Sequence, residues 1–481
     1  MSLVRRIYIL NFSLGESFSR LQFYCIKNHC IMSERKPIYL CLAHMSEEGV
    51  EQKYVKEAFD TNWVVPMGPN VNAFEADLRN FVSGMKNEEL RMKNASAVVC
   101  VSAGTAAVHL ALIACGVQAG DEVLVQSFTF CASSHPITYL GAKPVFVGSE
   151  AETWNMDPVL LEKAILDRKE VTGKYPKAII PVALYGMPYD CEKIMAIADK
   201  YGIPVIEDAA EGMGSRFDGQ VLGTFGRFGV LSFNGNKMIT TSGGGALICQ
   251  NQADANEVMW YATQARDAYP YYEHTAIGYN YRMSNVCAGI GRGQMTVLDA
   301  HIAHHKHVQD LYKELLKDVK GVTLHEQPAD PRYDSNFWLC AATLDADVKI
   351  VGQENAYKEV IKSAVGGAAG VIKAVESATT ECQPNDNVEA LRVFMLDKKV
   401  ECRPLWKPMH KQPVYTKVDS GELIVDSLGD GVVRQTCAKS VTYTKGVEED
   451  LFKVGFCLPA GPYVTDEDVH YIVDCIKEAI G

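Results

Sequence analysis

Short apolar runs alternate with stretches of helical periodicity between about residues 100 and 250. The apolar runs lie at 97–102, 121–130, 143–148, 177–186, 203–212, 226–233 and 243–249. Stretches such as 106–115 and 190–202, which lie between them, are typical of helices. Strands separated by helices predict an α/β domain with a mostly parallel sheet. Ligands of such sheets bind at the carboxyl ends of the strands.

The pattern becomes less regular after residue 295. Residues 294–319 predict one long helix, and the remainder mixes strands and helices. We therefore predict a large α/β domain at 32–295 and a smaller α+β domain at 296–481. Residues 363–380, which are rich in small side chains, predict a flexible insertion or a loosely packed helix.

Residues 1–31 imitate the beginning of a signal peptide, because MSLVRR precedes the apolar IYILNF. The apolar run is too short for one, and Ser13, Glu16 and Ser17 follow without a small-residue cleavage site. We interpret this segment as a poorly specified extension and expect the folded unit to begin near Met32. Detection of Met1 in the natively expressed protein by mass spectrometry would overturn this interpretation.

Length, charge and cysteine content narrow the class of protein. A chain of 481 residues can form two domains with substantial cores, and it has no apolar run long enough to span a membrane. The net charge of -12 argues against general affinity for nucleic acid or anionic lipid, so a phosphate-bearing ligand must be held by local geometry. The 15 cysteines contain no Cys-x-x-Cys pair, which argues against disulfides or zinc and favours a reducing cytoplasm.

His301, His304 and His305 share one face of the predicted helix at 294–319. Metal binding is one interpretation, but the sequence offers them no partnering carboxylate or cysteine motif. We favour a solvated or packed helix face and predict no metal.

Lys237 lies in the stretch SFNGNKMITTSGGG, behind an Asn-Gly pair and before three consecutive glycines. Because Asn-Gly between apolar runs is a hairpin signal, a solvated lysine in a mobile turn is the simpler interpretation of this stretch alone. Four predicted strand ends favour a different interpretation. They carry Gly104 and Thr105, Phe130, Asp208, and the run from Ser232 to Lys237, and we expect them to converge on one pocket.

A lysine and a carboxylate at strand ends suit pyridoxal phosphate. Lys237 can form a Schiff base with the cofactor aldehyde, and a desolvated site favours the neutral, nucleophilic amine. Asp208 can pair with the pyridinium nitrogen, so that the ring accepts electrons from the substrate carbon.

The remaining strand-end residues suit the phosphate and the ring of the same cofactor. Gly104 and Thr105 begin a predicted helix, whose N–H groups and dipole attract a phosphate, and Ser232 adds a hydroxyl. Phe130 could stack on the ring. Each also has an ordinary alternative, a helix cap or a core side chain, and their joint order along the chain favours the cofactor.

Six blocks in order resemble the DegT/StrS-type nucleotide-sugar aminotransferases, over about residues 68–469. The blocks are SAGTAAVHLAL, SFTFCASS, IPVIEDAAEGMGS, SFNGNKMITTSGGG, GYNYRMSN and RPLWKPMH. The resemblance implies fold type I of the pyridoxal phosphate enzymes (aspartate aminotransferase-like), with a mostly parallel seven-stranded sheet in the large domain. By the same resemblance Lys237 is the internal aldimine lysine and proton carrier, Asp208 faces the pyridine nitrogen, and Glu211 approaches the ring hydroxyl. Many relatives carry glutamine in place of this glutamate.

The other site residues also follow from the resemblance. Gly104, Thr105 and Ser232 would hold the phosphate, and Phe130 would cover the ring. Asn280 matches a residue that reaches the phosphate of a neighbouring subunit, which implies a homodimer with composite sites. The regions that line the sugar-nucleotide side correspond to Trp63, Arg282, Trp406 and His410. Ordinary packing in a proline-rich turn is the alternative for the last two.

The predicted function is transfer of an amino group from L-glutamate to a nucleotide-linked keto sugar. SFNGNK and RPLWKPMH most resemble members that act at C4 of UDP-linked 4-keto-6-deoxy-N-acetylhexosamines, which feed bacillosamine-type and other surface glycans. A GDP-linked or C3 substrate stays open.

Three rival functions are also considered. A pyridoxamine phosphate-dependent sugar dehydratase would carry histidine in place of Lys237. A silent regulator of the same fold would not need the intact set of site residues. A dinucleotide-binding oxidoreductase would need a complete glycine fingerprint, which GMGS at 212–215 lacks.

Overall fold

The computed structural model describes residues 35–83, 97–357, 382–416 and 423–481. The chain divides into two units, Met1–Pro37 and Ile38–Gly481, and all the elements below belong to the second. The predicted extension at 1–31 and the segment at 363–380 lie outside the described residues.

The main sheet is formed by the apolar runs that the sequence predicts as strands. Its strands are β1 (Ala97–Val101), β2 (Glu122–Gln126), β3 (Lys143–Val147), β4 (Ile179–Ile180), β5 (Ile206–Asp208), β8 (Phe228–Ser232) and β9 (Gly245–Cys249). Parallel bridges from Ile179 to Val205 and from Val182 to Asp208 join β4 to β5, which gives the order β3-β2-β4-β5-β8-β9-β1. Six of these strands run in the same direction, and β9 alone runs in the opposite direction. The predicted mostly parallel sheet is therefore confirmed.

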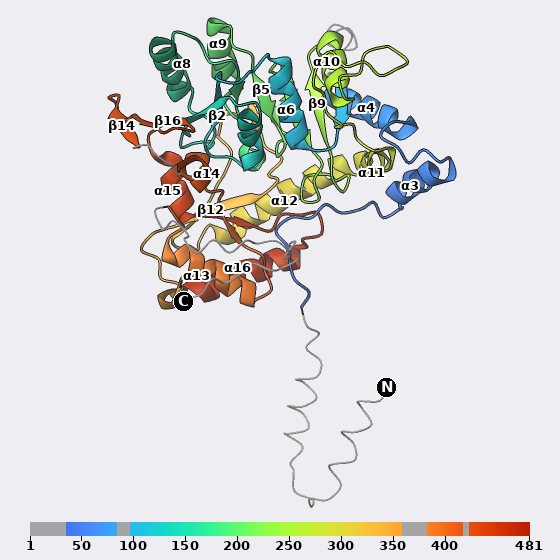
Figure 1. Ribbon diagram of the computed structural model, residues 1–481. Coiled ribbons are helices and arrows are strands. Elements are labelled where there is room, and N and C mark those ends of the chain that lie inside the picture. Colours follow the sequence, from blue (N-terminus) through green and yellow to red (C-terminus); the bar gives the residue numbers. More distant parts are fainter. Residues whose placement is uncertain (1–34, 84–96, 358–381, 417–422) are drawn as a thin grey trace, which may run out of the picture. The chain divides into compact units, whose positions relative to one another are not determined.

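Helices cover this sheet and connect its strands (Figure 1). They are α6 (Gly104–Ala114), α7 (His135–Tyr139), α8 (Pro158–Thr172), α9 (Cys191–Tyr201) and α10 (Gln252–Ala262), with the short 3-10 helices η1 (Cys131–Ser133) and η2 (Leu184–Gly186). Asp157 caps α8 by accepting hydrogen bonds from two backbone N–H groups, and Gly173 ends the helix with a φ of 74°. Helix α11 (Asn285–Met295) packs against α3 (Val50–Asp60) and α4 (Pro69–Val82).

A second, smaller sheet follows the long helix α12 (Leu298–Leu316), which lies within the predicted range. Its order is β10 (Val322–Leu324), β12 (Cys340–Leu344), β17 (Gly455–Leu458) and β13 (Arg403–Pro404), all antiparallel. Helices α13 (Asp386–Asp397) and α16 (Asp466–Ile480) pack with α12 around this sheet in a core of its own. The remaining short elements are β6 (Arg216–Phe217), β7 (Gln220–Val221), β11 (Tyr333–Asp334), η3 (Gln353–Asn355), η4 (Met409–Lys411), α14 (Pro413–Thr416) and α15 (Val447–Val454).

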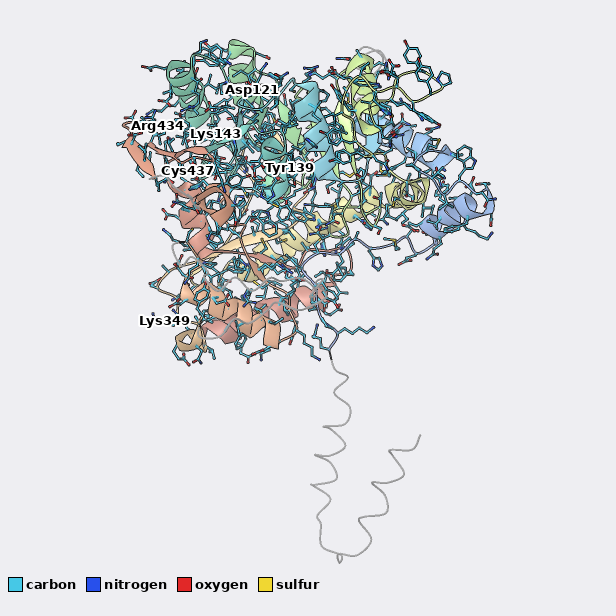
Figure 2. The ribbon with its side chains drawn as sticks, in the orientation of Figure 1. Asp121, Tyr139, Lys143, Lys349, Arg434 and Cys437 are labelled. Carbon is cyan, nitrogen blue, oxygen red and sulfur yellow. The ribbon has the colours of Figure 1, made fainter. Side chains whose placement is uncertain are left out.

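A three-stranded antiparallel meander from the carboxyl-terminal third extends the main sheet. It consists of β14 (Ile424–Ser427), β15 (Val433–Thr436) and β16 (Val441–Thr444), and β16 pairs in parallel with β3. Arg434, labelled in Figure 2, forms ion pairs with Asp167 at 2.8 Å and with Asp426 at 2.7 Å, which links the meander to α8. Residues after 296 therefore contribute to both sheets, and the division into domains at 32–295 and 296–481 stays a prediction.

None of the helices in the described ranges is long and apolar enough to cross a bilayer.

Candidate active site

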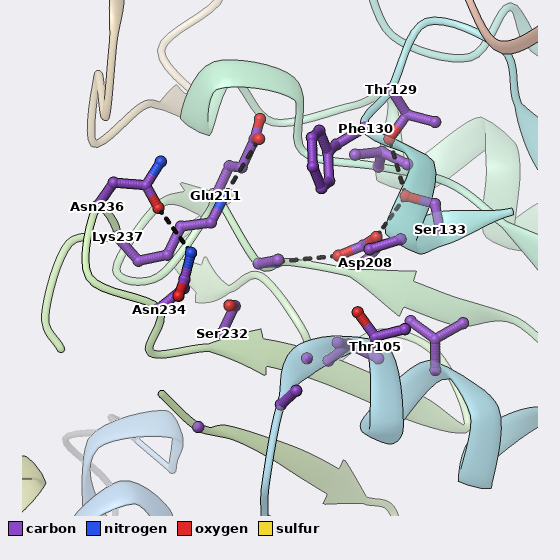
Figure 3. Close-up of a pocket in the computed structure, with 18 of the residues that line it drawn as sticks. Thr105, Thr129, Phe130, Ser133, Asp208, Glu211, Ser232, Asn234, Asn236 and Lys237 are labelled. Carbon is purple, nitrogen blue, oxygen red and sulfur yellow. Dashed lines mark hydrogen bonds and ion pairs between the residues drawn. The ribbon is translucent and has the colours of Figure 1, made fainter. Parts of the chain in front are cut away.

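A cavity of about 450 Å³ lies at the carboxyl ends of the main strands (Figure 3). Residues that follow β1, β2, β4, β5 and β8 line it, together with two tryptophans from the carboxyl-terminal third. The predicted site residues among them are Gly104, Thr105, Phe130, Asp208, Glu211, Ser232, Lys237 and Trp406. The structure thus brings together the four strand ends that the sequence singles out.

The wall suited to a phosphate is formed by the start of α6 and the end of β8. A Cβ added to Gly104 would lie 3.1 Å from the Cβ of Ser232, so a glycine lets the two segments approach closely. Thr105 and Ser232 both line the cavity, as Figure 3 shows. Backbone N–H groups at a helix start and nearby hydroxyls together attract a phosphate.

Asp208 is a buried carboxylate at the end of β5. It accepts hydrogen bonds from the Ser133 hydroxyl at 2.6 Å and from the backbone N–H of Ala210 at 3.2 Å. Burial raises the pKa of Asp208, and Ser133, Ala210 and the charge of Lys237 only partly oppose that rise. A cation against this carboxylate would remove the cost of its burial, which suits a protonated ring nitrogen.

The amine of Lys237 lies between an anion and an aromatic ring. Its Nζ is 3.3 Å from Oε1 of Glu211 and 3.9 Å from the centre of the Trp338 ring. The Lys237 side chain is only 13% exposed, and that of Glu211 is 5% exposed. Lys237 is therefore not the solvated turn lysine that its local sequence favours.

Trp338 is a cavity residue that the sequence does not reveal. It precedes β12, in the region where the apolar pattern is irregular, so neither periodicity nor a strand end points to it. Its indole N–H donates to the backbone oxygen of Asn236 at 2.7 Å. This bond attaches the ring to the turn that carries Lys237.

Phe130 and Trp406 form an aromatic pair that lines the same cavity. Their ring centres are 6.3 Å apart in an edge-to-face arrangement, and the Phe130 side chain is 57% exposed. Trp406 is held by its backbone N–H, which donates to the Tyr185 hydroxyl at 2.8 Å. An exposed ring beside the cavity leaves a face on which a flat ligand can stack.

The four other predicted residues do not line this cavity. Arg282 donates to Glu75 at 2.6 Å and to the Cys100 backbone oxygen at 2.8 Å. His410 is buried, with one ring nitrogen 2.6 Å from the Ser127 hydroxyl and the other 2.8 Å from Glu449. Trp63 and Asn280 are exposed. Their predicted roles toward the sugar nucleotide or a second subunit stay predictions.

Two of the helix histidines contact the backbone of residues that adjoin Lys237 and Trp338 in the sequence. His301 lies 3.3 Å from the Met238 carbonyl and His305 lies 3.2 Å from the Phe337 carbonyl. Burial lowers the pKa of His305 to about 3. Within the described ranges, no group of three or more His, Cys, Asp or Glu side chains is placed to hold a metal.

The set of groups in this cavity fits pyridoxal phosphate. The start of α6 and Ser232 offer donors for the phosphate, Asp208 offers a buried anion for the ring nitrogen, and Lys237 offers an amine for the aldehyde. The fit rests on the chemistry of these side chains and on their presence in one cavity.

Comparisons with known proteins agree with this chemistry. The profile of the DegT/DnrJ/EryC1/StrS aminotransferase family matches residues 45–369. The chain is 39% identical over 441 residues to the putative pyridoxal phosphate-dependent aminotransferase EpsN of Bacillus subtilis (strain 168), covering 92% of this chain and 95% of that protein. It is 30% identical over 441 residues to the GDP-perosamine synthase of Escherichia coli O157:H7, covering 92% and 98%.

A solved structure shares the fold. The putative sugar aminotransferase Spr1654 from Streptococcus pneumoniae, in its pyridoxal phosphate form, superposes with a TM-score of 0.71 at 20% identity. The match covers 92% of this chain and 98% of that one. Together with the sheet order, it confirms the predicted fold type I.

Proposed function

The chain belongs to the DegT/DnrJ/EryC1/StrS aminotransferase family, and from that premise we propose that it transfers an amino group from L-glutamate to C4 of a UDP-linked 4-keto-6-deoxy-N-acetylhexosamine. That it is a pyridoxal phosphate-dependent aminotransferase of nucleotide sugars follows from the family and its members. The UDP-linked acceptor, the C4 position and a role in surface glycans are the proposed part. The Lys237 amine, in one cavity with Asp208 and the phosphate wall, supports the amino-transfer chemistry. The proposed acceptor is supported by the resemblance of SFNGNK and RPLWKPMH to members that act at C4.

The residues of the chain have distinct roles in this proposal. Bound pyridoxal phosphate supplies an electron sink for the carbon that loses or gains a proton. Asp208 keeps the ring nitrogen protonated, and Lys237 carries the proton on its Nζ atom. Thr105 and Ser232 hold the phosphate, while Phe130 covers the ring. The largely buried setting of Lys237 limits competing reactions with water.

The acceptor is the part of the proposal that most needs a test. The purified protein is incubated with nitrogen-15-labelled L-glutamate and, separately, with a UDP-linked 4-keto, a UDP-linked 3-keto and a GDP-linked 4-keto sugar. We expect labelled nitrogen in the UDP-linked 4-amino product, at a rate at least about tenfold above the other two. Faster labelling of the 3-keto or GDP-linked sugar would overturn the acceptor. The same mass spectra test the dehydratase alternative, which predicts a product that has lost water and gained no nitrogen.

A homodimer with composite sites is a second part of the proposal, supported by apolar side chains that one chain leaves exposed. They are Phe59, Trp63, Val64, Val65, Met67, Tyr269, Tyr271, Tyr272 and Ile277. Asn280 is exposed in the same segment as the last four. We expect Lys237→Ala and Asn280→Ala to be inactive separately and to regain part of the activity when co-expressed. No regain in the mixed protein, or a monomer in sedimentation, would contradict this arrangement.

We also propose a cytoplasmic location, because every cysteine in the described ranges carries a free thiol. Recovery of the native protein from a secreted fraction would contradict this location.

A further inference from the structure

Two hydroxyl groups lie between the carboxylate of Asp208 and the turn that carries Phe130. This turn leaves the end of β2 and runs through Phe130 into the short helix η1. Thr129 and Ser133 lie at its two ends, and we call them the hydroxyl pair (Figure 3). Both line the cavity, and Thr129 is 2% exposed and Ser133 1% exposed. Two polar groups are thus buried beside a buried carboxylate.

The hydrogen bonds of the hydroxyl pair run in one direction. The Ser133 hydroxyl donates to Oδ2 of Asp208 at 2.6 Å, a length typical of a hydrogen bond from a hydroxyl to a charged carboxylate. A serine hydroxyl has one hydrogen, so Ser133 accepts in its contact with Thr129, where the two oxygens are 2.8 Å apart. Thr129 therefore donates to Ser133, and both hydroxyl hydrogens are directed toward Asp208.

This arrangement favours a charged carboxylate at Asp208. Burial raises the pKa of Asp208, and the hydrogen bond from Ser133 opposes that rise more than the backbone N–H of Ala210 or the charge of Lys237 does. The hydrogen bond that Thr129 donates polarises the Ser133 hydroxyl and strengthens its bond to the carboxylate. Thr129 can therefore act on Asp208 through Ser133.

The same turn presents the ring that we propose to cover the cofactor. The backbone N–H of Thr129 donates to the Ser127 carbonyl at 3.1 Å, and that of Ser133 donates to the Phe130 carbonyl at 3.3 Å. The bond from Ser133 to Asp208 joins this turn to the end of β5. The hydroxyl pair thus links the exposed Phe130 ring to the buried anion.

Stabilisation of the turn alone is the simpler role for these hydroxyls. Serine and threonine side chains often form hydrogen bonds within their own segment, and the contact between Thr129 and Ser133, four residues apart, is of that kind. The bond from Ser133 to Asp208 is different, because it joins residues 75 positions apart in the sequence. A role limited to the turn would not need this long-range bond to a carboxylate.

We propose that the hydroxyl pair holds the Asp208 carboxylate charged and in place for the cofactor ring nitrogen, with Thr129 as a positioning residue that acts through Ser133. The inference rests on the role proposed for Asp208, which is to pair with that nitrogen. It goes beyond that role, because it assigns two further side chains to recognition of the nitrogen.

The test compares two ligands that differ at one atom. Cofactor-free protein is studied by equilibrium dialysis with pyridoxal phosphate and with its carbocyclic analogue, in which a C–H group replaces the ring nitrogen. Both ligands offer the same phosphate and aldehyde, but only pyridoxal phosphate offers Asp208 a cation. We call the ratio of the two dissociation constants the nitrogen preference. Asp208→Asn should lower it at least about tenfold.

Variants of the hydroxyl pair should lower the nitrogen preference in a set order. We expect Ser133→Ala to lower it about tenfold, because a hydrogen bond to the charged group is lost. Thr129→Val, which keeps the shape of the side chain, should lower it about threefold. Thr129→Ser, which keeps the hydroxyl, should stay within about twofold of wild type. If Ser133→Ala does not fold, the comparison of Thr129→Val with Thr129→Ser still tests the hydroxyl pair.

Ser46 provides a matched control for Ser133. Its hydroxyl also donates to a buried carboxylate at 2.6 Å, that of Glu51, and it does not line the cavity. We expect Ser46→Ala to lower the free energy of unfolding and to leave the nitrogen preference unchanged. An equal loss of preference in Ser46→Ala and Ser133→Ala would contradict a specific role for the hydroxyl pair.

Two further results would overturn the inference, and they differ in what they leave standing. An unchanged nitrogen preference in Ser133→Ala or Thr129→Val, with a loss in Asp208→Asn, would remove the hydroxyl pair and keep the role of Asp208. An unchanged preference in Asp208→Asn would remove that role as well. The dialysis needs neither L-glutamate nor sugar, so a wrong acceptor would leave the expected pattern intact.

Discussion

The main sheet has one hollow at the carboxyl ends of its strands and another at their amino ends. The larger of the two lies at the amino ends, away from Lys237 and Asp208. The hollow at the amino ends of the strands measures about 580 Å³, against about 450 Å³ for the Lys237 cavity. It is lined by residues that precede β2, β4, β5 and β8, and Asp121, labelled in Figure 2, marks this end. Each hollow is lined by at least one lysine, by two carboxylates and by aromatic rings.

The difference lies in how the polar groups are held. Lys174 and Lys177 at the amino end are exposed, and Glu122 and Arg227 are engaged by ion pairs with Arg168 at 2.9 Å and Asp254 at 2.7 Å. In the Lys237 cavity the carboxylates are buried and aimed at one space. Volume alone therefore does not mark a reactive site, whereas buried polar groups with a shared direction do.

The same contrast appears between two adjacent residues of β5. Glu207 is buried, and its carboxylate accepts the backbone N–H groups of Gly223 at 2.8 Å and Gly226 at 2.7 Å, as well as that of Phe225. Asp208 points to the other face, into the cavity, because successive strand side chains alternate. The carboxylate of Glu207 is surrounded by backbone N–H groups, whereas that of Asp208 lines the cavity, where it can also face a ligand cation.

The sharpest test of this contrast is Asp208→Asn. The variant keeps the size of the side chain and loses the charge that we propose to pair with the ring nitrogen. We expect kcat to fall about 10²- to 10³-fold, with little change in the free energy of unfolding. Steady-state kinetics and urea unfolding measure the two quantities.

Glu207→Gln is the control for that variant. It should lower the free energy of unfolding by about 1 to 3 kcal/mol, because one amide oxygen replaces two carboxylate oxygens in a buried network. Its kcat per folded molecule should stay within about twofold of wild type. A large loss of kcat in Glu207→Gln with little loss in Asp208→Asn would reverse the assignment of the two carboxylates.

Phe130→Leu tests whether the exposed ring stacks on the cofactor. Loss of the aromatic face should weaken pyridoxal phosphate binding about tenfold, which equilibrium dialysis with the cofactor-free protein measures. Tyr139 is a comparable exposed aromatic residue that does not line the cavity. The Tyr139→Leu variant should therefore bind pyridoxal phosphate as tightly as wild type. Equal binding by wild type and Phe130→Leu would remove Phe130 from the cofactor site.

The pH dependence of stability gives a smaller but directional effect. Burial raises the pKa of Asp208 in the folded state above the ordinary value of 3.8, which the unfolded state keeps. At a pH between the unfolded-state pKa and the folded-state pKa, the folded protein therefore binds more protons than the unfolded protein. The free energy of unfolding of the cofactor-free wild type should therefore fall, relative to Asp208→Asn, as the pH rises through this window. Urea unfolding from pH 3.5 to 6 measures that difference. A rise in it would mean that the folded protein stabilises the charged carboxylate.

The smallest expected effect is at the opposite hollow. The double variant Lys174→Ala with Lys177→Ala removes two exposed charges from its rim. We expect kcat/KM and stability to stay within experimental error of wild type. A tenfold loss of kcat/KM would show that the larger hollow also serves the reaction.

The sequence was sufficient to predict the parts of the site that strand ends carry. Lys237, Asp208, Thr105 and Ser232 each follow an apolar run, and parallel strands bring such positions to one edge. Trp338 could not be predicted in this way, because its place depends on long-range packing of a short strand from an irregular region. The sequence did not predict the pairing of β16 with β3 for the same reason, since no local sequence pattern indicates which sheet a short meander will extend.

The measurement that tests the central claim most directly is borohydride reduction of the cofactor-bound enzyme, followed by peptide mass spectrometry. We predict that the cofactor mass is found on Lys237, and that prior incubation with L-glutamate removes it. Attachment to another lysine, or to none, would contradict the account of the Lys237 cavity.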